Sequence, residues 1–223
     1  VTIGTHETLS IYIATFFWEL SPFQIGFLAI ANLIGFHLGF FFASIAHTRF
    51  DKRWTIVFSA AGLSIFWSTA VTLGLLGFAP ANSTLPLVVF IIFWTIFSSV
   101  FGSVLNISVM SALADITDEH EARTGRRQEG IFYSARTFFA KTSNAIGHVV
   151  AGIAIEYYVL LPPGSIQGEV PADVLFRLGV VEGPFAMVWG LIAALFYAGY
   201  RIDRASYERV QEQLREQRSK AAT

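Results

Sequence analysis

The most constraining feature of this sequence is a run of 61 consecutive residues, from Trp54 to Ala114, that contains no Asp, Glu, Lys or Arg. The hydrocarbon core of a bilayer is about 30 Å thick, and a helix needs about 20 mostly apolar residues to cross it. The run is long enough for two spans and the turn between them. The sequence therefore predicts an all-α membrane protein rather than a water-soluble domain.

The composition supports a membrane protein and excludes several functional classes. Of the 223 residues, 54% are hydrophobic and 14% are charged, whereas soluble domains carry about 25% charged residues. Cysteine is absent, which excludes disulfides and thiolate metal sites. The sequence has no His, Asp and Glu set at metal-ligand spacing, no nucleophile–base pair and no glycine-rich phosphate loop. It also lacks the basic, aromatic-interleaved patch of a nucleic-acid-binding protein. We predict neither an enzyme nor a resident metal or cofactor.

Apolar segments and turn residues divide the chain into five complete spans and part of another. Ser21 and Pro22 indicate a helix start, and the stretches 80–86 and 162–164 have the composition of helix breaks. Residues 9–17 are apolar but too short to span, so we interpret them as the end of a helix whose beginning is missing. The complete spans are predicted at 24–46, 54–77, 87–113, 131–161 and 178–200.

The predicted domain organisation is a six-helix transmembrane bundle over residues 1–201, with a truncated first helix, and a cytoplasmic tail over 202–223. Because the chain begins with Val1 inside an apolar segment, we expect the whole protein to add about 200 residues with six further spans, since one repeat cannot enclose the cavity between two halves.

Lys and Arg residues are strongly biased to alternate connections between the spans. Residues 47–53 hold three, residues 115–130 hold three and the C-terminal tail holds six. The opposite connections hold only Arg177. Because cytoplasmic segments are enriched in Lys and Arg, these three segments and the C-terminus are predicted to face the cytoplasm. We expect a multi-pass protein of the plasma membrane, or of the inner membrane in a bacterium.

A polar stripe runs along the predicted fifth span. Ser134, Thr137, Lys141, Asn144 and His148 follow one another at steps of three or four, which places them on one helix face. A polar face on an apolar span should meet protein or a water-filled cavity rather than lipid. We predict that the stripe lines a cavity; helix packing and snorkelling of Lys141 are the alternatives.

Small and polar residues also follow helical spacing in two other spans. In the fourth span, Thr95, Ser99, Gly102 and Asn106 share a face, and this row suits either helix packing or solute contact. Asn106 is the predicted solute contact, because its amide both donates and accepts hydrogen bonds. In the second span, Gly35, Gly39 and Ala43 are predicted to allow close packing of a neighbouring helix.

The densest motif is ADITDEHEARTGRRQEGIFYS, which covers residues 114–134 and is followed by Phe139-Ala140-Lys141. Its charged part, residues 115–129, is predicted to be a loop. The motif resembles the signature of the glycoside–pentoside–hexuronide:cation symporters, the melibiose-carrier-like branch of the major facilitator superfamily. That signature reads roughly A-D-x-x-D-x-x-E-x-x-x-G-x-R-x-E-G-I-x-x-S, with a membrane lysine in the next helix. The six-helix layout extends the resemblance over the whole chain as the C-terminal half of such a carrier.

The resemblance implies roles for particular residues. Asp115, Asp118 and Arg127 match positions of a cytoplasmic salt-bridge gate, and Lys141 matches a lysine near the sugar and cation sites. Glu121 and Glu129 complete the predicted gate, whose members are Asp115, Asp118, Glu121, Arg127 and Glu129. The position of a sugar-contacting tryptophan in the family is occupied here by Asn106. The coupling-cation carboxylates of the family lie in the N-terminal half, so Na⁺ or H⁺ is expected to bind mainly outside this chain.

Together these patterns predict a secondary active transporter. The predicted function is cation-coupled symport of a sugar or related polar solute by alternating access, with partners in the bilayer, the solute and an N-terminal six-helix half. The predicted solute-binding residues are Lys141, Asn144, His148, Thr137 and Asn106. The alternatives are transport of a lipid-like or amphiphilic solute, for which the Asn106 departure and 22 Phe leave room, and a non-transporting membrane scaffold or receptor.

Overall fold

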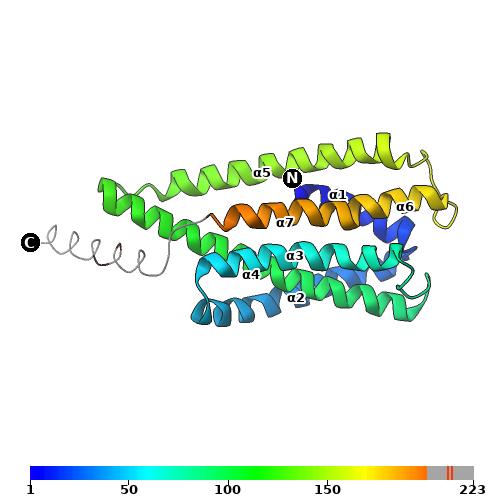
Figure 1. Cartoon of the computed structure of the whole chain (residues 1–223), viewed down its shortest axis with the longest axis horizontal. Coiled ribbons are helices and arrows are strands. Elements are labelled where there is room, and N and C mark those ends of the chain that lie inside the picture. The colour runs from blue at the N-terminus through cyan, green and yellow to red at the C-terminus, as the bar shows by residue number, and fades with distance from the viewer. Residues whose placement is uncertain (200–209, 211, 213–223) are drawn as a thin grey trace, which may run out of the picture.

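The computed structural model describes residues 1–199, 210 and 212, and within these residues all regular structure is helical (Figure 1). Three of the elements are five-residue π-helical turns that continue an α-helix, and they carry the label η. The elements in chain order are α1 (Thr2–Tyr12), η1 (Ile13–Phe17), α2 (Pro22–Arg49), α3 (Lys52–Leu75), α4 (Leu85–Thr124), α5 (Glu129–Ala154), η2 (Ile155–Val159), α6 (Ala172–Val180), η3 (Val181–Phe185) and α7 (Ala186–Tyr197). The predicted tail, residues 202–223, lies outside the described residues except for 210 and 212.

Within the described residues, five helical segments are long and apolar enough to cross a membrane, which confirms the predicted number of complete spans. They cover Pro22–Arg49, Lys52–Leu75, Leu85–Thr124, Glu129–Val159 and Ala172–Tyr197. The predicted start of the second span is also confirmed. Ser21 caps α2 in a reciprocal pair with Gln24, and Pro22 occupies the first turn, where a missing backbone N–H costs nothing.

Two boundaries differ from the sequence prediction. The last span begins at Ala172 rather than 178, so Arg177 lies in a helix, where it pairs with Asp173 one turn away at 3.0 Å. The first helix begins at Thr2 and therefore includes the polar residues that precede Leu9. Charged or polar side chains alone do not end a helix. They lower the mean hydropathy of its first turns, so the sequence pattern places the start of the span too late.

The segment 115–129 is mostly helix, so the predicted charged loop is wrong. α4 continues without a break through Asp115 to Thr124 and ends at Gly125, whose φ of 68° is the left-handed conformation that glycine adopts most easily. The segment before Gly125 contains no proline or glycine, so nothing in it ends the helix earlier. At 1.5 Å per residue, the 40 residues of α4 span about 60 Å, and its last turns extend beyond the neighbouring ends of α2 and α3 (Figure 1).

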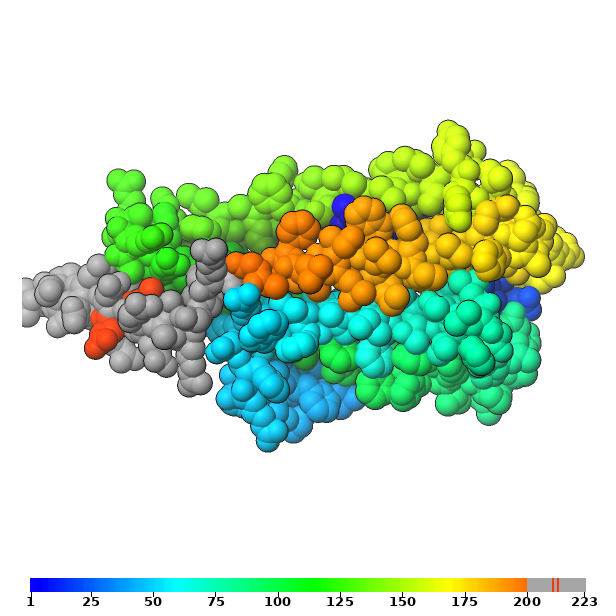
Figure 2. Space-filling view, viewed as in Figure 1, coloured from blue at the N-terminus to red at the C-terminus, as the bar shows by residue number. Residues whose placement is uncertain are grey.

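The helices pack in pairs, chiefly α2 with α4, α3 with α4, α1 with α5 and α3 with α7. In the space-filling view the surface of α7 lies directly on α3 (Figure 2). A Cβ atom at Gly35 would lie 2.7 Å from Ser99 Cβ, and one at Gly39 would lie 2.4 Å from Ser103 Cβ. Both contacts leave room for glycine only, which confirms the packing role predicted for this row. Ser99 belongs to the α4 row and is buried in this contact.

α2 and α5 are the outermost of the long helices. Only 17% of the most apolar window of α2 and 11% of that of the α5–η2 segment are buried, compared with 56% for α3. Their outward side chains are large and apolar, for example Phe41 and Phe138, which are 66% and 64% exposed. These surfaces suit lipid or a further protein partner.

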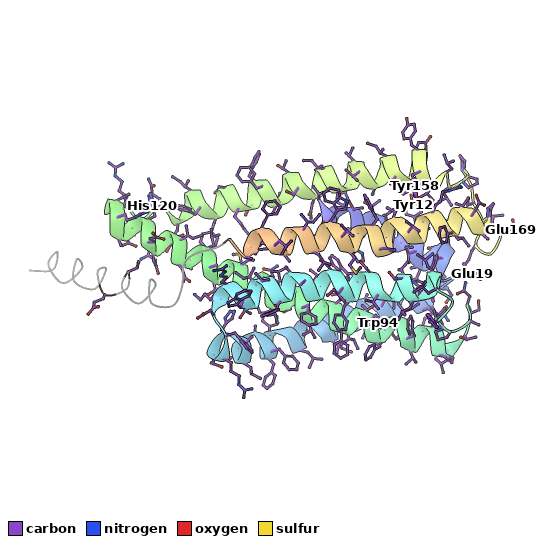
Figure 3. The ribbon with its side chains drawn as sticks, in the orientation of Figure 1. Tyr12, Glu19, Trp94, His120, Tyr158 and Glu169 are labelled. Atoms are coloured by element: carbon purple, nitrogen blue, oxygen red, sulfur yellow. The ribbon has the colours of Figure 1, made fainter. Side chains whose placement is uncertain are left out.

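The segments 47–53 and 115–129 lie at one end of the bundle, together with the end of α7 (Figure 1). His120 marks this end, whereas Glu19 and Glu169 mark the opposite end (Figure 3). The basic segments predicted to share one side of a membrane, as far as they are described, therefore do lie on one side of the molecule.

Candidate functional site

The bundle contains a pocket of about 600 Å³ between α1, α2, α3 and α4. Its wall combines aromatic rings with a few polar groups, which is the usual make-up of a small-molecule site. The aromatic members are Trp18, Phe66, Trp67 and Trp94, and the polar members are His6, Ser10, Asn32, Thr95, Ser98 and Glu182.

Trp94 lies in α4, on the side where α4 passes α3 and α2 (Figure 3). Its ring contacts that of Phe66, with the ring centroids 5.4 Å apart. The indole Nε1 is buried and has no hydrogen-bond acceptor among the described residues. Buried polar groups are nearly always paired, so this unpartnered N–H is an exception next to the pocket.

Glu182 and His6 form a hydrogen-bonded pair at the back of the pocket. Nδ1 of His6 on α1 contacts Oε1 of Glu182 on η3. The His6 ring stacks on Trp67 of α3, with centroids 4.0 Å apart and planes 17° apart. Glu182 is 2% exposed, and its second oxygen, Oε2, has no partner within the described part of the chain. The site thus holds a membrane-buried acid with one satisfied and one unsatisfied oxygen.

The sequence analysis missed both members of this pair. A signal was present, because Glu182 is an acid within an apolar segment that also contains Pro184, and intramembrane acids are usually functional. It lies in a π-helical turn, a distortion often found at functional sites. His6 could not have been paired with it, because the two residues are 176 positions apart.

The predicted solute residues of α5 do not line this pocket. Thr137 and Lys141 are exposed. Asn144 and His148 lie against α1: a Cβ atom at Gly4 would come within 2.2 Å of the Asn144 carbonyl oxygen, and His148 Nδ1 lies 2.8 Å from Thr8 Oγ1. Two of the five stripe residues therefore lie against α1, and the other three, Ser134, Thr137 and Lys141, are exposed.

Asn106, the remaining predicted solute residue, is exposed on α4 and also lies outside the pocket wall. The predicted solute residues therefore do not line one common cavity in the structure. Their role in solute binding stays a prediction.

The predicted gate residues divide into two groups at the basic end. Asp115 is buried and accepts two hydrogen bonds from Lys52 Nζ, at 2.6 and 2.8 Å. This contact joins α4 to the first turn of α3. Lys52 was counted in the sequence only as a basic residue of the preceding connection, since a partner 63 positions away leaves no local pattern.

The second group surrounds Arg127, between the end of α4 and the start of α5. Arg127 Nη2 lies 2.5 Å from Glu129 Oε1, and Nη1 lies 3.9 Å from Glu121 Oε2. The hydrogen bond to Glu129 and the attraction of Glu129 and Glu121 raise the pKa of Arg127, with a smaller contribution from Asp118. All five predicted gate residues thus lie at one end of the bundle, but Asp115 pairs with α3 and not with Arg127.

The family model described as MFS/sugar transport protein matches residues 1–204. This chain belongs to that family. The match includes every described helix, so the helices, the pocket and the basic end are those of a member of the MFS/sugar transport family. It confirms the resemblance to a symporter branch of the major facilitator superfamily and identifies a multi-pass membrane protein of a transporter family rather than an enzyme family.

Two curated relatives are similar to part of this family member. "Uncharacterized symporter sll1374" of Synechocystis sp. is 31% identical over 124 residues, which are 53% of this chain and 22% of the relative. "Putative glycoside/cation symporter YagG" of Escherichia coli (strain K12) is 27% identical over 126 residues, which are 53% of this chain and 25% of the relative. The match thus covers about a quarter of each relative. No solved structure matches the chain.

Proposed function

We propose that this chain is one six-helix half of a cation-coupled symporter that moves a sugar or related polar solute by alternating access. The pocket is the observation that carries the proposal. Flat aromatic rings such as Trp67 and Trp94 suit the apolar face of a sugar ring, and Asn32 and Thr95 offer hydrogen bonds to its hydroxyl groups. Family membership and the symporter names of both relatives support transport.

A second six-helix half is part of this proposal. The relatives extend far beyond the matched segment, and the outward faces of α2 and α5 are too apolar to meet water. We propose that an N-terminal half covers part of these faces and that lipid covers the rest. The exposed Lys141 and Thr137 would then contribute to solute binding from α5, with Asn106 from α4.

The basic end is proposed to face the cytoplasm and to act as the gate. The concentration of Lys and Arg at this end supports the orientation, with the C-terminus inside the plasma membrane or bacterial inner membrane. Asp115, Asp118, Glu121, Arg127 and Glu129 would hold the cytoplasmic side shut through ion pairs. The coupling ion is proposed to be Na⁺ or H⁺, bound mainly by the N-terminal half, as the resemblance implies.

Uptake by the full-length protein in liposomes tests the function. We expect at least one sugar from a panel of galactosides, glucosides, pentosides and hexuronides to accumulate when an inward Na⁺ or H⁺ gradient is applied, and to leak out when an ionophore collapses the gradient. Accumulation of an amphiphile, such as a lysophospholipid, and of no sugar would favour transport of a lipid-like or amphiphilic solute, which the largely apolar pocket wall also suits. If the protein accumulated neither a sugar nor an amphiphile, both proposed solute classes would be contradicted.

Lys141 provides a sharper test of the α5 stripe. If it contacts the solute or the second half, Lys141→Ala abolishes accumulation at unchanged membrane abundance. The matched control is Thr142→Ala, because Thr142 is the next residue on α5, is equally exposed and lies off the stripe. Uptake by Lys141→Ala at more than half the parental rate would mean that this lysine only reaches to the membrane surface.

A further inference from the structure

The His6–Glu182 pair lies where a carboxylate is costly, inside a predicted membrane span. An isolated charge in a low-dielectric interior is strongly disfavoured unless it is paired or neutralised. Glu182 has one partner, the imidazole of His6, and its second oxygen is unsatisfied within the described residues. One bound proton would make the pair neutral overall, whether the proton lies on the carboxyl group or on the ring.

The charges around Glu182 leave His6 as the group that faces it. η3 packs against α1, α3, α6 and α7. The charged groups of α6, Asp173 and Arg177, pair with each other. Glu7 on α1 lies 3.6 Å from His148. The remaining titratable groups of these helices are Tyr12, Tyr197, Lys52 and Arg53, of which the last two lie at the far end of α3. Within the described part of the chain, no second acid or fixed cation competes for the pair.

The ring of His6 has an aromatic neighbour as well as an acidic one. The ring lies flat on Trp67, and a cation over an indole face is attracted by the π-electrons. His6, Trp67 and Glu182 all line the pocket, so a molecule that enters it meets the pair directly. A change in water access to this pocket therefore changes the environment of the proton.

We propose that the His6–Glu182 pair is a proton-binding site within this half of the transporter. The pair takes up one proton from water when the pocket opens on one side, carries it as a neutral pair while the pocket is closed, and releases it to water on the other side. No other reactant is needed, since the proton that enters is the proton that leaves. The proposal rests on the proposed transport function and adds H⁺ as a coupling ion that binds this chain itself.

The test follows protonation directly and requires no solute. The full-length protein is titrated with acid while the infrared stretch of protonated carboxyl groups and the fluorescence of Trp67 are recorded, because a protonated histidine stacked on an indole quenches its emission. A Trp67→Phe variant identifies the Trp67 signal. Because the one proton is shared between the carboxyl group and the ring, we expect a carboxyl band and a quenching step over the same pH range in the parental protein. Both should be lost in Glu182→Gln, and the quenching step should be lost in His6→Gln.

Glu156→Gln is the matched control, because Glu156 also lies in a π-helical turn, η2, but is exposed; it should retain both signals. Symmetrical size-exclusion profiles and a single melting transition well above the titration temperature exclude misfolding of the variants. A parental protein without a titration step, or a step that both Glu182→Gln and His6→Gln retain, would overturn the proposal.

Replacing choline with Na⁺ at constant ionic strength should leave the titration unchanged. A Na⁺-dependent shift that Glu182→Gln removes would assign the site to Na⁺ and overturn the proton proposal. If sugar uptake fails but the titration behaves as expected, the transported solute is wrong and the proton site stands.

Discussion

The two charged regions of this bundle use the same chemistry in opposite surroundings. At the basic end, Arg127 is 56% exposed and its acidic partners come from the neighbouring turns of the same motif. In the pocket, Glu182 is 2% exposed and its partner comes from a helix 176 residues earlier. The Asp115–Lys52 pair lies between these extremes, because its carboxylate is buried but its lysine is partly open to solvent.

This difference determines what each pair can contribute. Water and salt weaken an exposed ion pair, so it contributes little to stability and opens at little cost. A buried pair is costly to form and costlier to break, because removing one member leaves an uncompensated charge. The exposed pairs therefore suit a gate that opens in every cycle, and the buried pair suits a site that is neutral while it is closed off from water.

The largest expected effect is the loss of stability when the buried pair is broken. His6→Ala removes the partner of Glu182, and breaking a buried pair costs about 3–5 kcal/mol. We expect the melting midpoint of the purified protein to fall further than for any single variant of the basic end. The double variant His6→Phe with Glu182→Met should recover most of the loss, because apolar side chains of similar volume need no charge partner. A double variant no more stable than His6→Ala would show that the pair is not the source of the cost.

An intermediate effect is expected at the Asp115–Lys52 pair. Asp115→Asn keeps the shape but loses the charge of a carboxylate that accepts two hydrogen bonds, and such bonds contribute about 1.5–3 kcal/mol each. We expect a fall in the denaturation midpoint that is smaller than for His6→Ala and is insensitive to added salt. Exchanging the two residues, Asp115→Lys with Lys52→Asp, should restore part of the loss. If high salt restored the parental denaturation midpoint to Asp115→Asn, the Asp115–Lys52 pair would behave like the exposed ion pairs around Arg127.

The smallest effect on stability is expected for Arg127, although its effect on transport is larger. Arg127→Gln should leave the melting midpoint unchanged, because the guanidinium is exposed, but it should favour inward-open states and lower concentrative uptake. This chain contains no cysteine, so Asn106→Cys provides a clean reporter, and its labelling should be faster in Arg127→Gln. High salt should reproduce this change in the parental protein.

The Asp118→Arg with Arg127→Asp exchange tests whether these two gate residues act on each other. It should slow the labelling again if they do. Unchanged labelling together with reduced uptake in Arg127→Gln would mean that the gate assignment is wrong and that this end acts in folding or insertion.

The spans could be predicted from the sequence because their cause is local. A backbone in hydrocarbon must satisfy its own hydrogen bonds, so an apolar run of sufficient length has to be helical wherever it packs. The packing role of Gly35 and Gly39 was predictable for a similar reason, since small residues at four-residue steps leave a groove whatever fills it. The error at 115–124 arose because charge was taken as a sign of a loop, whereas a helix that has left the membrane can carry charge freely.

The pocket could not be predicted, because it exists only once the helices are assembled. His6 and Glu182 each look like a single polar residue near the start of a helix, and neither belongs to the stripe or the motif that drew attention. Trp67 and Trp94 look like ordinary membrane aromatics until α3 and α4 place them on one wall. A single sequence does not indicate which distant helices pack against each other.

The length of α4 has a mechanical consequence. Along its middle the helix is held against α2 by contacts so close that only glycine fits, and its final turns extend past the neighbouring helix ends to Thr124. A rod clamped near its centre behaves as a lever: a small tilt at the clamp becomes a larger sweep at the free tip, in proportion to the length of the arm. Asp118 and Glu121 lie in these final turns of α4. A tilt of α4 about its contacts with Gly35 and Gly39 would thus be magnified at the charges of the basic end, because the helix continues to Thr124 with no loop between them.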